Sequence, residues 1–304
     1  MMAAAAQGRG AIWAGAGLLL MDALLLASWS GGFIGIRFAS DYAPIFLILL
    51  WRSLLSGLLL LPLALLIGPR MNARQVLLQA LFGGFGMASY LGTFALAIGQ
   101  GVPTGLVALI TDMLPLAVAL LSWPVLGERL NRRQWLGTVI GLAGVLLACG
   151  GSLHVGGGPL WAYGLPVAGT VALAVVVLLQ KRWPAQQMAV HQSLAIQCLS
   201  AAAMFAVFAW HDGGVLPVMR IEFVGGILWL VFVATFMSWG IYYLALRKSS
   251  PARVSSVLYL SPPLTLVWAW AMFGEPLSWA MAFGLAVSLA GIIIVARATP
   301  KQGR

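Results

Sequence analysis

Long apolar runs follow one another along the chain, separated by short stretches that hold the charges and turn residues. A helix that crosses a membrane needs roughly 20 mostly apolar residues, and each run is long enough. The runs are apolar all round, so helical phase can be read only from their few polar and aromatic residues. Ten helices are predicted, near residues 11–36, 42–67, 74–98, 102–126, 134–152, 159–180, 189–210, 223–246, 252–273 and 278–296.

Composition supports an all-α polytopic membrane protein. Of the 304 residues, 62% are hydrophobic and 8% are charged, whereas a soluble domain carries about 25% charged residues. A soluble fold could not cover that much apolar surface. The first run follows Arg9 and has no clear small-residue cleavage site, so we interpret it as a retained first helix rather than a signal peptide.

The basic residues indicate the orientation. If the N-terminus is cytoplasmic, fourteen of the seventeen Lys and Arg fall on that side; Arg37 and Arg220 fall on the other, and Arg52 lies within a span. The positive-inside rule then predicts a bacterial inner-membrane protein with both termini cytoplasmic. Nucleic-acid binding would require a basic stripe or patch, and the net charge of +10 is instead spread in small groups.

The second half of the chain repeats the first. Three residues of the first half match three of the second at an offset of 147, namely Pro115, Gly127 and Glu128 with Pro262, Gly274 and Glu275. The predicted repeats are residues 1–152 and 153–304, with five spans each. Because five is odd, the second copy enters the membrane from the opposite side. Inverted repeats place a substrate site near the bilayer midplane, between the halves.

Two five-span halves, each with a Pro-containing helix, a Gly-Glu loop and a last helix rich in small residues, resemble the EamA-type branch of the drug/metabolite transporter superfamily. The segment Trp29-Ser30-Gly31-Gly32-Phe33 and Arg52 also fit its pattern. Within that branch the chain looks most like bacterial aromatic amino-acid exporters of the YddG type. The resemblance covers essentially the whole chain and implies a central cavity formed by spans 1, 3, 4, 6, 8 and 9, with spans 5 and 10 peripheral. Asp112 departs from the pattern, which leaves the coupling mechanism open.

Three ionisable residues lie deep in predicted spans: Asp22, Arg52 and Asp112. Charges at such depth are costly and face protein or water. One interpretation is that an acid binds a substrate ammonium and Arg52 binds a carboxylate, as a zwitterionic amino acid would require. The alternative is that Asp22 and Arg52, on consecutive spans, form a structural pair. Asp112 has no partner nearby in sequence and is the stronger candidate for the cavity.

Aromatic residues recur at helical spacing and add candidates for substrate binding. These are Tyr90 and Phe94 in span 3, Trp239, Tyr242 and Tyr243 in span 8, and Tyr259 in span 9. Tyr259 is the repeat partner of Asp112, so the two are expected to face one cavity. Ordinary helix packing, or a belt at the membrane interface, is the alternative for each ring.

Prolines and glycines mark mechanical features of the spans. Pro115, Pro262 and Pro263 interrupt the hydrogen-bond ladders of spans 4 and 9, either as hinges or for static shape. Glycines in spans 5 and 10 permit close helix contact. They could pack within one subunit or form a homodimer through their glycine faces.

These observations favour secondary transport of a small amphipathic metabolite by alternating access, with export of aromatic or other neutral amino acids as the first expectation. A multidrug or other metabolite carrier of this fold is the alternative. An inverted repeat fits a channel less well. An enzyme is not expected, because His154, His191 and His211 have no carboxylate at ligand spacing.

No GxxxxGK[ST] loop is present, and Cys149 and Cys198 have no metal-ligand neighbours at suitable spacing. The sequence therefore predicts no cofactor, metal site or catalytic residue. The predicted partners are a small-molecule substrate and the lipid bilayer.

Overall fold

The computed structural model is helical across its ten predicted spans and describes residues 2–127, 130–154, 158–183, 188–249 and 251–298. The repeat-matched Glu128 lies outside these residues. In chain order the elements are α1 (Met2–Ser40), α2 (Ile45–Leu66), α3 (Ala73–Phe82), η1 (Gly83–Met87), α4 (Ala88–Gly99), α5 (Thr104–Thr111), α6 (Leu114–Leu126), α7 (Arg132–His154), η2 (Leu160–Tyr163), α8 (Gly164–Arg182), α9 (Val190–His211), α10 (Ile221–Leu228), η4 (Trp229–Met237), α11 (Ser238–Lys248), α12 (Pro251–Leu258), α13 (Ser261–Phe273) and α14 (Trp279–Ala298).

Grouped along the chain, these elements form ten segments at the predicted places. Nine candidate spans in the described part are long and apolar enough to cross a bilayer. The tenth segment is α14, whose 20 residues reach about 30 Å at 1.5 Å per residue, the thickness of a hydrocarbon core. The predicted all-α architecture, two repeats of five membrane helices, is confirmed.

Local sequence signals explain where several helices begin and end. Asn72 begins α3 with a capping box, in which Asn72 and Gln75 each accept a hydrogen bond from the other's backbone. Asn131 and Gln134 exchange the same bonds at the start of α7. At the repeat-related ends of α6 and α13, a glycine takes the left-handed conformation that terminates a helix at low cost, at φ +77° and +66° respectively.

Spans 4 and 9 are each broken into two half-helices at equivalent positions. The first break falls at Asp112 and Met113, between α5 and α6, and the second falls 147 residues later, between α12 and α13. Pro115 and Pro262 stand in the first turn of the half-helices that follow. There a missing N–H is tolerated, whereas inside a continuous helix it would remove a hydrogen bond. The prolines therefore begin new half-helices just beyond the two breaks.

Spans 3 and 8 share a different irregularity. Each contains a π-helical segment, η1 in span 3 and η4 in span 8. Such segments are rare and occur often at functional sites. The irregular backbone is therefore concentrated in the two pairs of spans, 3 with 8 and 4 with 9, that are related by the repeat.

Spans 5 and 10 pack against each other inside the chain. A Cβ atom on Gly137 would approach the carbonyl oxygen of Gly291 at 2.8 Å, and one on Gly144 would meet the backbone of Ser288. The Ser288 hydroxyl donates to the Gly141 carbonyl at 2.7 Å. These glycines are covered by this contact within the chain, because two faces in one chain meet without losing the entropy of association. The predicted homodimer through spans 5 and 10 stays a prediction.

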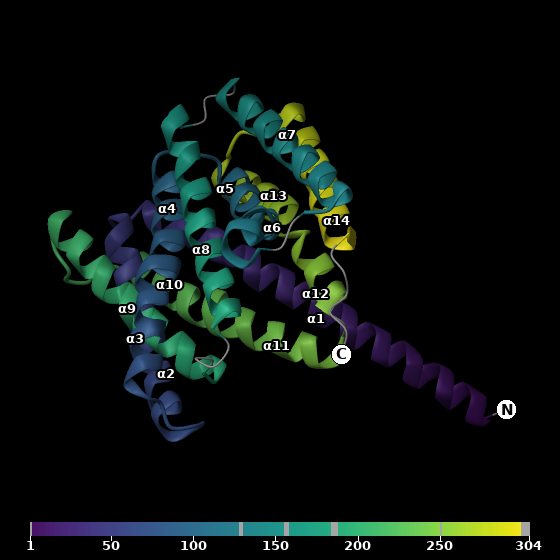
Figure 1. Cartoon of the computed structure of the whole chain (residues 1–304), viewed down its shortest axis with the longest axis horizontal. Coiled ribbons are helices and arrows are strands. Elements are labelled where there is room, and N and C mark those ends of the chain that lie inside the picture. The colour runs from purple at the N-terminus through teal and green to yellow at the C-terminus, as the bar shows by residue number, and fades with distance from the viewer. Residues whose placement is uncertain (1, 128–129, 155–157, 184–187, 250, 299–304) are drawn as a thin grey trace.

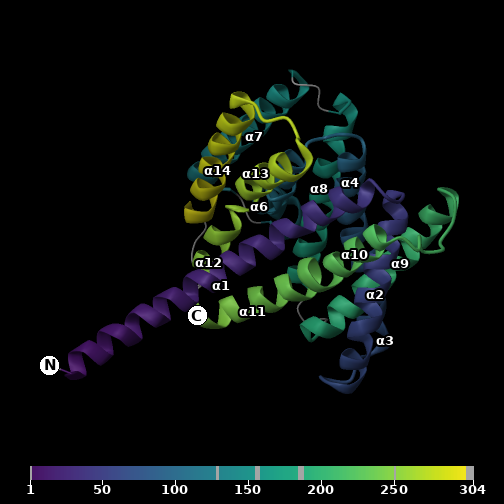
Figure 2. The ribbon, with the colours of Figure 1, turned by 180° about the vertical axis from the view of Figure 1, so that it is seen from behind.

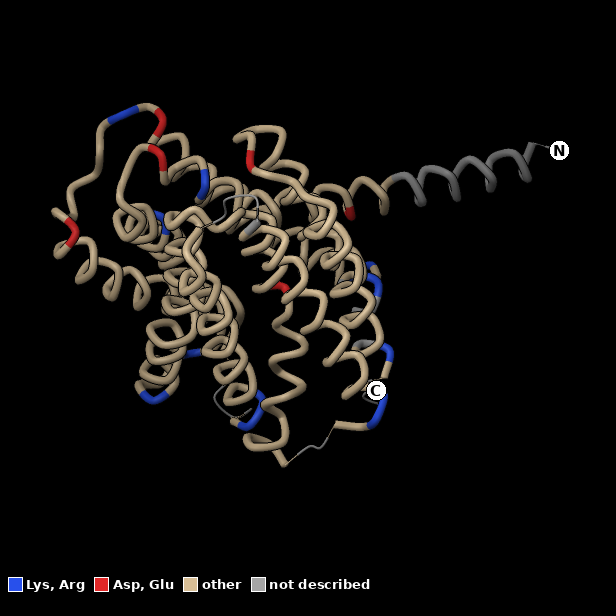
Figure 3. Tube along the Cα trace, turned by 90° about the horizontal axis from the view of Figure 1, so that it is seen from above, with Lys and Arg blue, Asp and Glu red and all other residues tan. Residues whose placement is uncertain are grey.

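Figures 1 and 2 show the resulting layout from opposite sides. Helices α7 and α14 lie side by side at one edge, and α1 runs along α11. Figure 3 shows that most charged residues lie at helix ends and in connections rather than along the helices. The π-helical segments η1 and η4, and the breaks of spans 4 and 9, all contribute residues to one cavity, which is described below.

Candidate substrate-binding cavity

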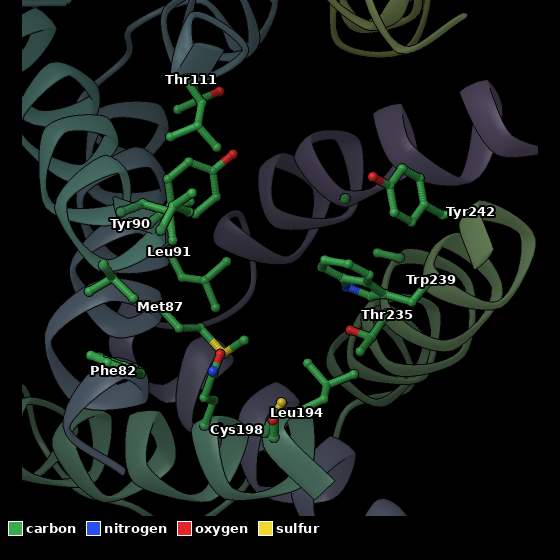
Figure 4. Close-up of a pocket in the computed structure, with 18 of the residues that line it drawn as sticks. Phe82, Met87, Tyr90, Leu91, Thr111, Leu194, Cys198, Thr235, Trp239 and Tyr242 are labelled. Atoms are coloured by element: carbon green, nitrogen blue, oxygen red, sulfur yellow. The ribbon is translucent and has the colours of Figure 1, made fainter. Parts of the chain in front are cut away.

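A cavity of about 750 Å³ lies between the two repeats (Figure 4). This volume falls within the roughly 300–1,000 Å³ range of small-molecule sites. Its described lining comes from spans 1, 3, 4, 6, 8 and 9, as the resemblance implied, and α7 and α14 contribute none of it. Spans 2 and 7 also contribute, through Arg52 and Ser53 of α2 and Ser193 and Cys198 of α9. The expected set of six spans was therefore too small.

Most of the predicted site residues line this cavity. They are Arg52, Tyr90, Phe94, Asp112, Pro115, Trp239, Tyr243 and Tyr259. Pro262 and Pro263 are outside the lining and begin α13 beyond the break. The structure thus brings together side chains that are more than 200 positions apart in the sequence.

Asp22 does not belong to the cavity. Its Oδ2 accepts a hydrogen bond from Arg253 Nη2 at 2.7 Å. Arg253 lies in the first turn of α12, so Asp22 lies level with the start of span 9 and not with the break at its middle. Asp22 is not among the described residues that line the cavity, and its predicted pairing with Arg52 is wrong. A partner from the other repeat could not be seen in the local sequence.

Arg52 and Asp112 share the cavity, and each keeps a buried atom without a partner. Neither Arg52 Nη1 nor Asp112 Oδ2 has a hydrogen-bond partner among the described residues. The Trp29 and Ser261 side chains lie next to the Asp112 carboxyl group. Burying a charge without full pairing is costly. The two groups are therefore available to bind a ligand in the cavity.

The backbone break positions Asp112 against the second repeat. Its carboxyl contact, Ser261, is the first residue of α13 and lies two residues after Tyr259. The breaks of spans 4 and 9 therefore meet. Asp112 and Tyr259 line one cavity as expected, but the polar contact to Asp112 across the repeats is made by Ser261.

Tyr90 connects the two charged groups. Its hydroxyl lies next to the side chain of Thr111, the last residue of α5, and near the charged groups of Arg52 and Asp112 (Figure 4). Its ring makes an edge-on contact with Phe94, with 5.5 Å between the centroids. Tyr90 is thus placed to contact a ligand that spans the two charges.

Four aromatic rings form another wall. The Trp29 and Trp239 centroids are 5.9 Å apart, Tyr243 stacks on Trp239 at 5.9 Å, and Tyr242 lies 5.8 Å from Trp239. Figure 4 shows Trp239 and Tyr242 across the cavity from Tyr90. These rings line the cavity with apolar surface, and the two tyrosines add hydroxyl groups.

Sequence reasoning missed a polar pair on the lining. Gln197 Nε2 donates to Gln79 Oε1 at 2.6 Å, joining α9 to α3. A signal for Gln197 was present in the sequence. Helices α2 and α9 each have 22 residues, and aligning their first residues makes Gln197 the repeat partner of Arg52. The match was hidden because these spans follow an offset of 145, not the 147 of the proline and glycine motif.

The two ends of the cavity differ. Toward the ends of α8 and α9 that adjoin Lys181 and Arg182, the lining continues to Gln180, Trp183 and Met188. Toward the Glu275 end the lining stops, and buried apolar residues fill the space, among them Ile36, Ile98 and Leu106. The cavity therefore extends toward the basic ends of the helices and is closed at the other.

An inverted repeat, discontinuous helices and a central cavity closed at one end define a membrane transporter. The chain belongs to the EamA-like transporter family, whose sequence model matches it twice, over residues 15–150 and 160–297. It is a multi-pass membrane protein of this family and not an enzyme.

Several relatives align over most of both chains. An uncharacterized inner membrane transporter, YedA of Escherichia coli, is 27% identical over 273 residues, covering 88% of this chain and 86% of that protein. A probable amino-acid metabolite efflux pump of Salmonella typhimurium is 26% identical, covering 89% and 92%. A probable terminal-alkyne amino-acid exporter of Streptantibioticus cattleyicolor is 27% identical, covering 91% and 92%. A solved crystal structure shares the fold with a TM-score of 0.59 at 20% identity, covering 92% of this chain and 96% of that one.

Proposed function

We propose that this protein exports small zwitterionic metabolites, with aromatic or other neutral amino acids as the best candidates, by alternating access. The observation that carries the proposal is the pair of opposite charges, Arg52 and Asp112, which line one cavity, each with an unpartnered buried atom. Exporters of amino acids or their metabolites among the relatives support the same substrate class.

The charges fit the two ends of an amino acid. The planar guanidinium of Arg52 suits a carboxylate, and the Asp112 carboxylate suits an ammonium. A single ligand that bears both groups compensates both buried charges at once. A simple cation or anion would leave one of them uncompensated, which costs free energy.

The aromatic walls favour a ligand with an apolar or aromatic side chain. Rings of Trp239, Tyr243 and Tyr259 offer stacking surface, and a cation above such a ring gains roughly 0.5 to 2 kcal/mol. Hydroxyl groups on the tyrosines add polar contacts without adding charge. The lining therefore selects for amphipathic ligands rather than for highly polar ones.

Orientation follows from the basic residues. With both termini cytoplasmic, the end that opens near Lys181 is the cytoplasmic end, and the Glu275 end is periplasmic. Half-helices α5 and α6, and likewise α12 and α13, then move about their breaks, with Pro115, Pro262 and Pro263 favouring bending there. Labelling Ser278→Cys but not Asn131→Cys from the periplasm would support this topology, and the reverse pattern would exclude it.

Counterflow in proteoliposomes tests the substrate class. Vesicles loaded with a neutral amino acid should accumulate the labelled form, whereas amines and carboxylic acids without the second charge should compete weakly. Replacing Arg52 with Gln or Asp112 with Asn should each weaken affinity by roughly 10- to 100-fold, as expected for a lost bond to a charged group. Equal competition by single-charge analogues would exclude the zwitterion proposal and favour a broader multidrug carrier.

A further inference from the structure

The closed end of the cavity is held by a carboxylate that crosses between the repeats. Glu275 follows the glycine that terminates α13. Its Oε2 accepts the backbone N–H of Thr104 at 2.7 Å, and its Oε1 accepts the Thr104 hydroxyl at 2.6 Å. Pro103, before Thr104, provides no side-chain cap. Glu275 thus caps the N-terminus of a half-helix in the other repeat, where a negative charge is favourable.

Arg37 completes the contact at the end of α1. Its Nε lies 3.5 Å from Glu275 Oε1, and its guanidinium carbon lies 4.8 Å from the centroid of the Phe273 ring. Asp41 binds Nη1 of the same arginine at 2.5 Å. The Glu275 side chain is only 12% exposed, so its charge depends on these partners. The contact joins α1, α5 and α13 at one face.

Close packing lies directly behind this contact. A Cβ atom on Gly105 would approach the Leu266 Cα at 2.5 Å, so α5 and α13 touch through their backbones. Thr104 is fully buried. A substrate leaving by this face must part α5 from α13, and that movement separates Glu275 from Thr104.

We propose that Glu275 is a latch that keeps this end closed, and that its release from Thr104 is a required step of transport. The inference rests on alternating access in the proposed function but not on the identity of the substrate. Release hydrates a buried carboxylate and uncaps α5, while Arg37 keeps Asp41 as a partner.

The latch belongs to one end only, for a reason visible in the sequence. The repeat partner of Thr104 is Pro251, and proline has neither an N–H nor a hydroxyl. The donors that hold Glu275 are therefore missing from the equivalent position of the second repeat. In the structure the Glu275 face is accordingly the closed one, and the cavity extends toward the basic end.

Cysteine accessibility tests the latch without any substrate. Ala269 is fully buried on α13, three residues from Leu266 and on the same helix face. In a protein with Cys149 and Cys198 changed to Ser, Ala269→Cys would be labelled with a membrane-impermeant maleimide from the Glu275 face. Glu275→Ala should raise the labelling rate about tenfold, as expected for losing a hydrogen bond to a charged group. Glu275→Gln should raise it less, since its amide oxygen still accepts one bond.

Controls separate the latch from general loosening. Thr104→Val keeps the shape and removes the hydroxyl, so it should also accelerate labelling, and the double variant should not exceed Glu275→Ala alone. Glu222, paired with Arg220 at 3.9 Å at the start of α10, is the matched control, and Glu222→Gln should leave the rate unchanged. An unaltered rate in folded, monodisperse Glu275→Ala, or equal acceleration by Glu222→Gln, would overturn the proposal. Neither result would affect the counterflow test of the substrate class.

Discussion

Two pairs of repeat-related spans, α7 with α14 and α5–α6 with α12–α13, pack in different ways. Along α7 and α14 the contacts obey the repeat: Gly137 meets Gly291 and Gly144 meets Gly284, so each half makes the same contact. The contacts of the broken spans do not obey the repeat. The half-helices at the Glu275 end, α5 and α13, touch each other, whereas α6 packs on α8 and α12 packs on α1 and α11.

The difference distinguishes a scaffold from moving parts. A contact that is the same in both repeats does not need to change when the cavity closes on one side and opens on the other. A contact present at one end only must be broken, and remade at the other end, when the cavity changes the side on which it opens. We therefore expect substitutions along α7 and α14 to affect stability, and substitutions along the broken spans to affect transport.

The largest effect is expected from Gly144→Leu in the symmetric pair. The new side chain would collide with the backbone of Ser288, so overpacking should lower stability by about 3 kcal/mol or more. Thermal unfolding in detergent measures this. Gly150→Leu on the same helix is the control, because nothing lies within 4 Å of a Cβ there. Equal losses in both variants would mean that the α7–α14 contact is not special.

A smaller loss is expected from Gly105→Ala in the asymmetric pair. The methyl group pushes Leu266 away and should cost about 1–3 kcal/mol, mainly by opening the closed end. The melting temperature should fall modestly while labelling of Ala269→Cys from the Glu275 face increases. Gly240→Ala, with open space around its Cβ, should change neither quantity. If Ala269→Cys stayed protected from labelling in the Gly105→Ala variant, the packing of Gly105 against Leu266 would not be what keeps this end closed.

Pro115→Ala should affect rate more than binding. Restoring an N–H lets residue 115 bond the Thr111 carbonyl and continue the helix through the break, and one such bond is worth about 1 kcal/mol. Exchange should slow about fivefold, with substrate affinity nearly unchanged. Counterflow and equilibrium binding on the same preparation provide the comparison. Unchanged exchange would leave the proline a role in static shape only.

The smallest effect is expected from Asp22→Asn. The amide oxygen of Asn can still accept a hydrogen bond from Arg253, which binds Asp22 Oδ2 at 2.7 Å outside the cavity, so the loss of stability should be about 1 kcal/mol. The melting temperature should fall slightly, and affinity for the transported amino acid should stay at the wild-type value. A large loss of affinity would indicate that Asp22 contacts the substrate.

Part of the candidate site could be predicted from sequence because depth and symmetry are local properties of the chain. Arg52 and Asp112 stood out as charges inside apolar runs, and the repeat related Asp112 to Tyr259. Asp22 also lies inside a predicted apolar run, but it is not among the described residues that line the cavity. Its partner, Arg253, is 231 positions away, and no local pattern shows which of two acids inside predicted spans pairs with a basic residue.

The sequence by itself determined the ten spans, the two repeats and the places where helices break, because apolar length, proline and left-handed glycine act within one or two helical turns. Only the tertiary structure decided which glycine faces meet, which acid lines the cavity and which end is closed. These outcomes depend on pairings between repeats, as between Glu275 and Thr104. Two inverted halves with the same arrangement of helices can close at either end, so the choice between the two ends is made by such contacts.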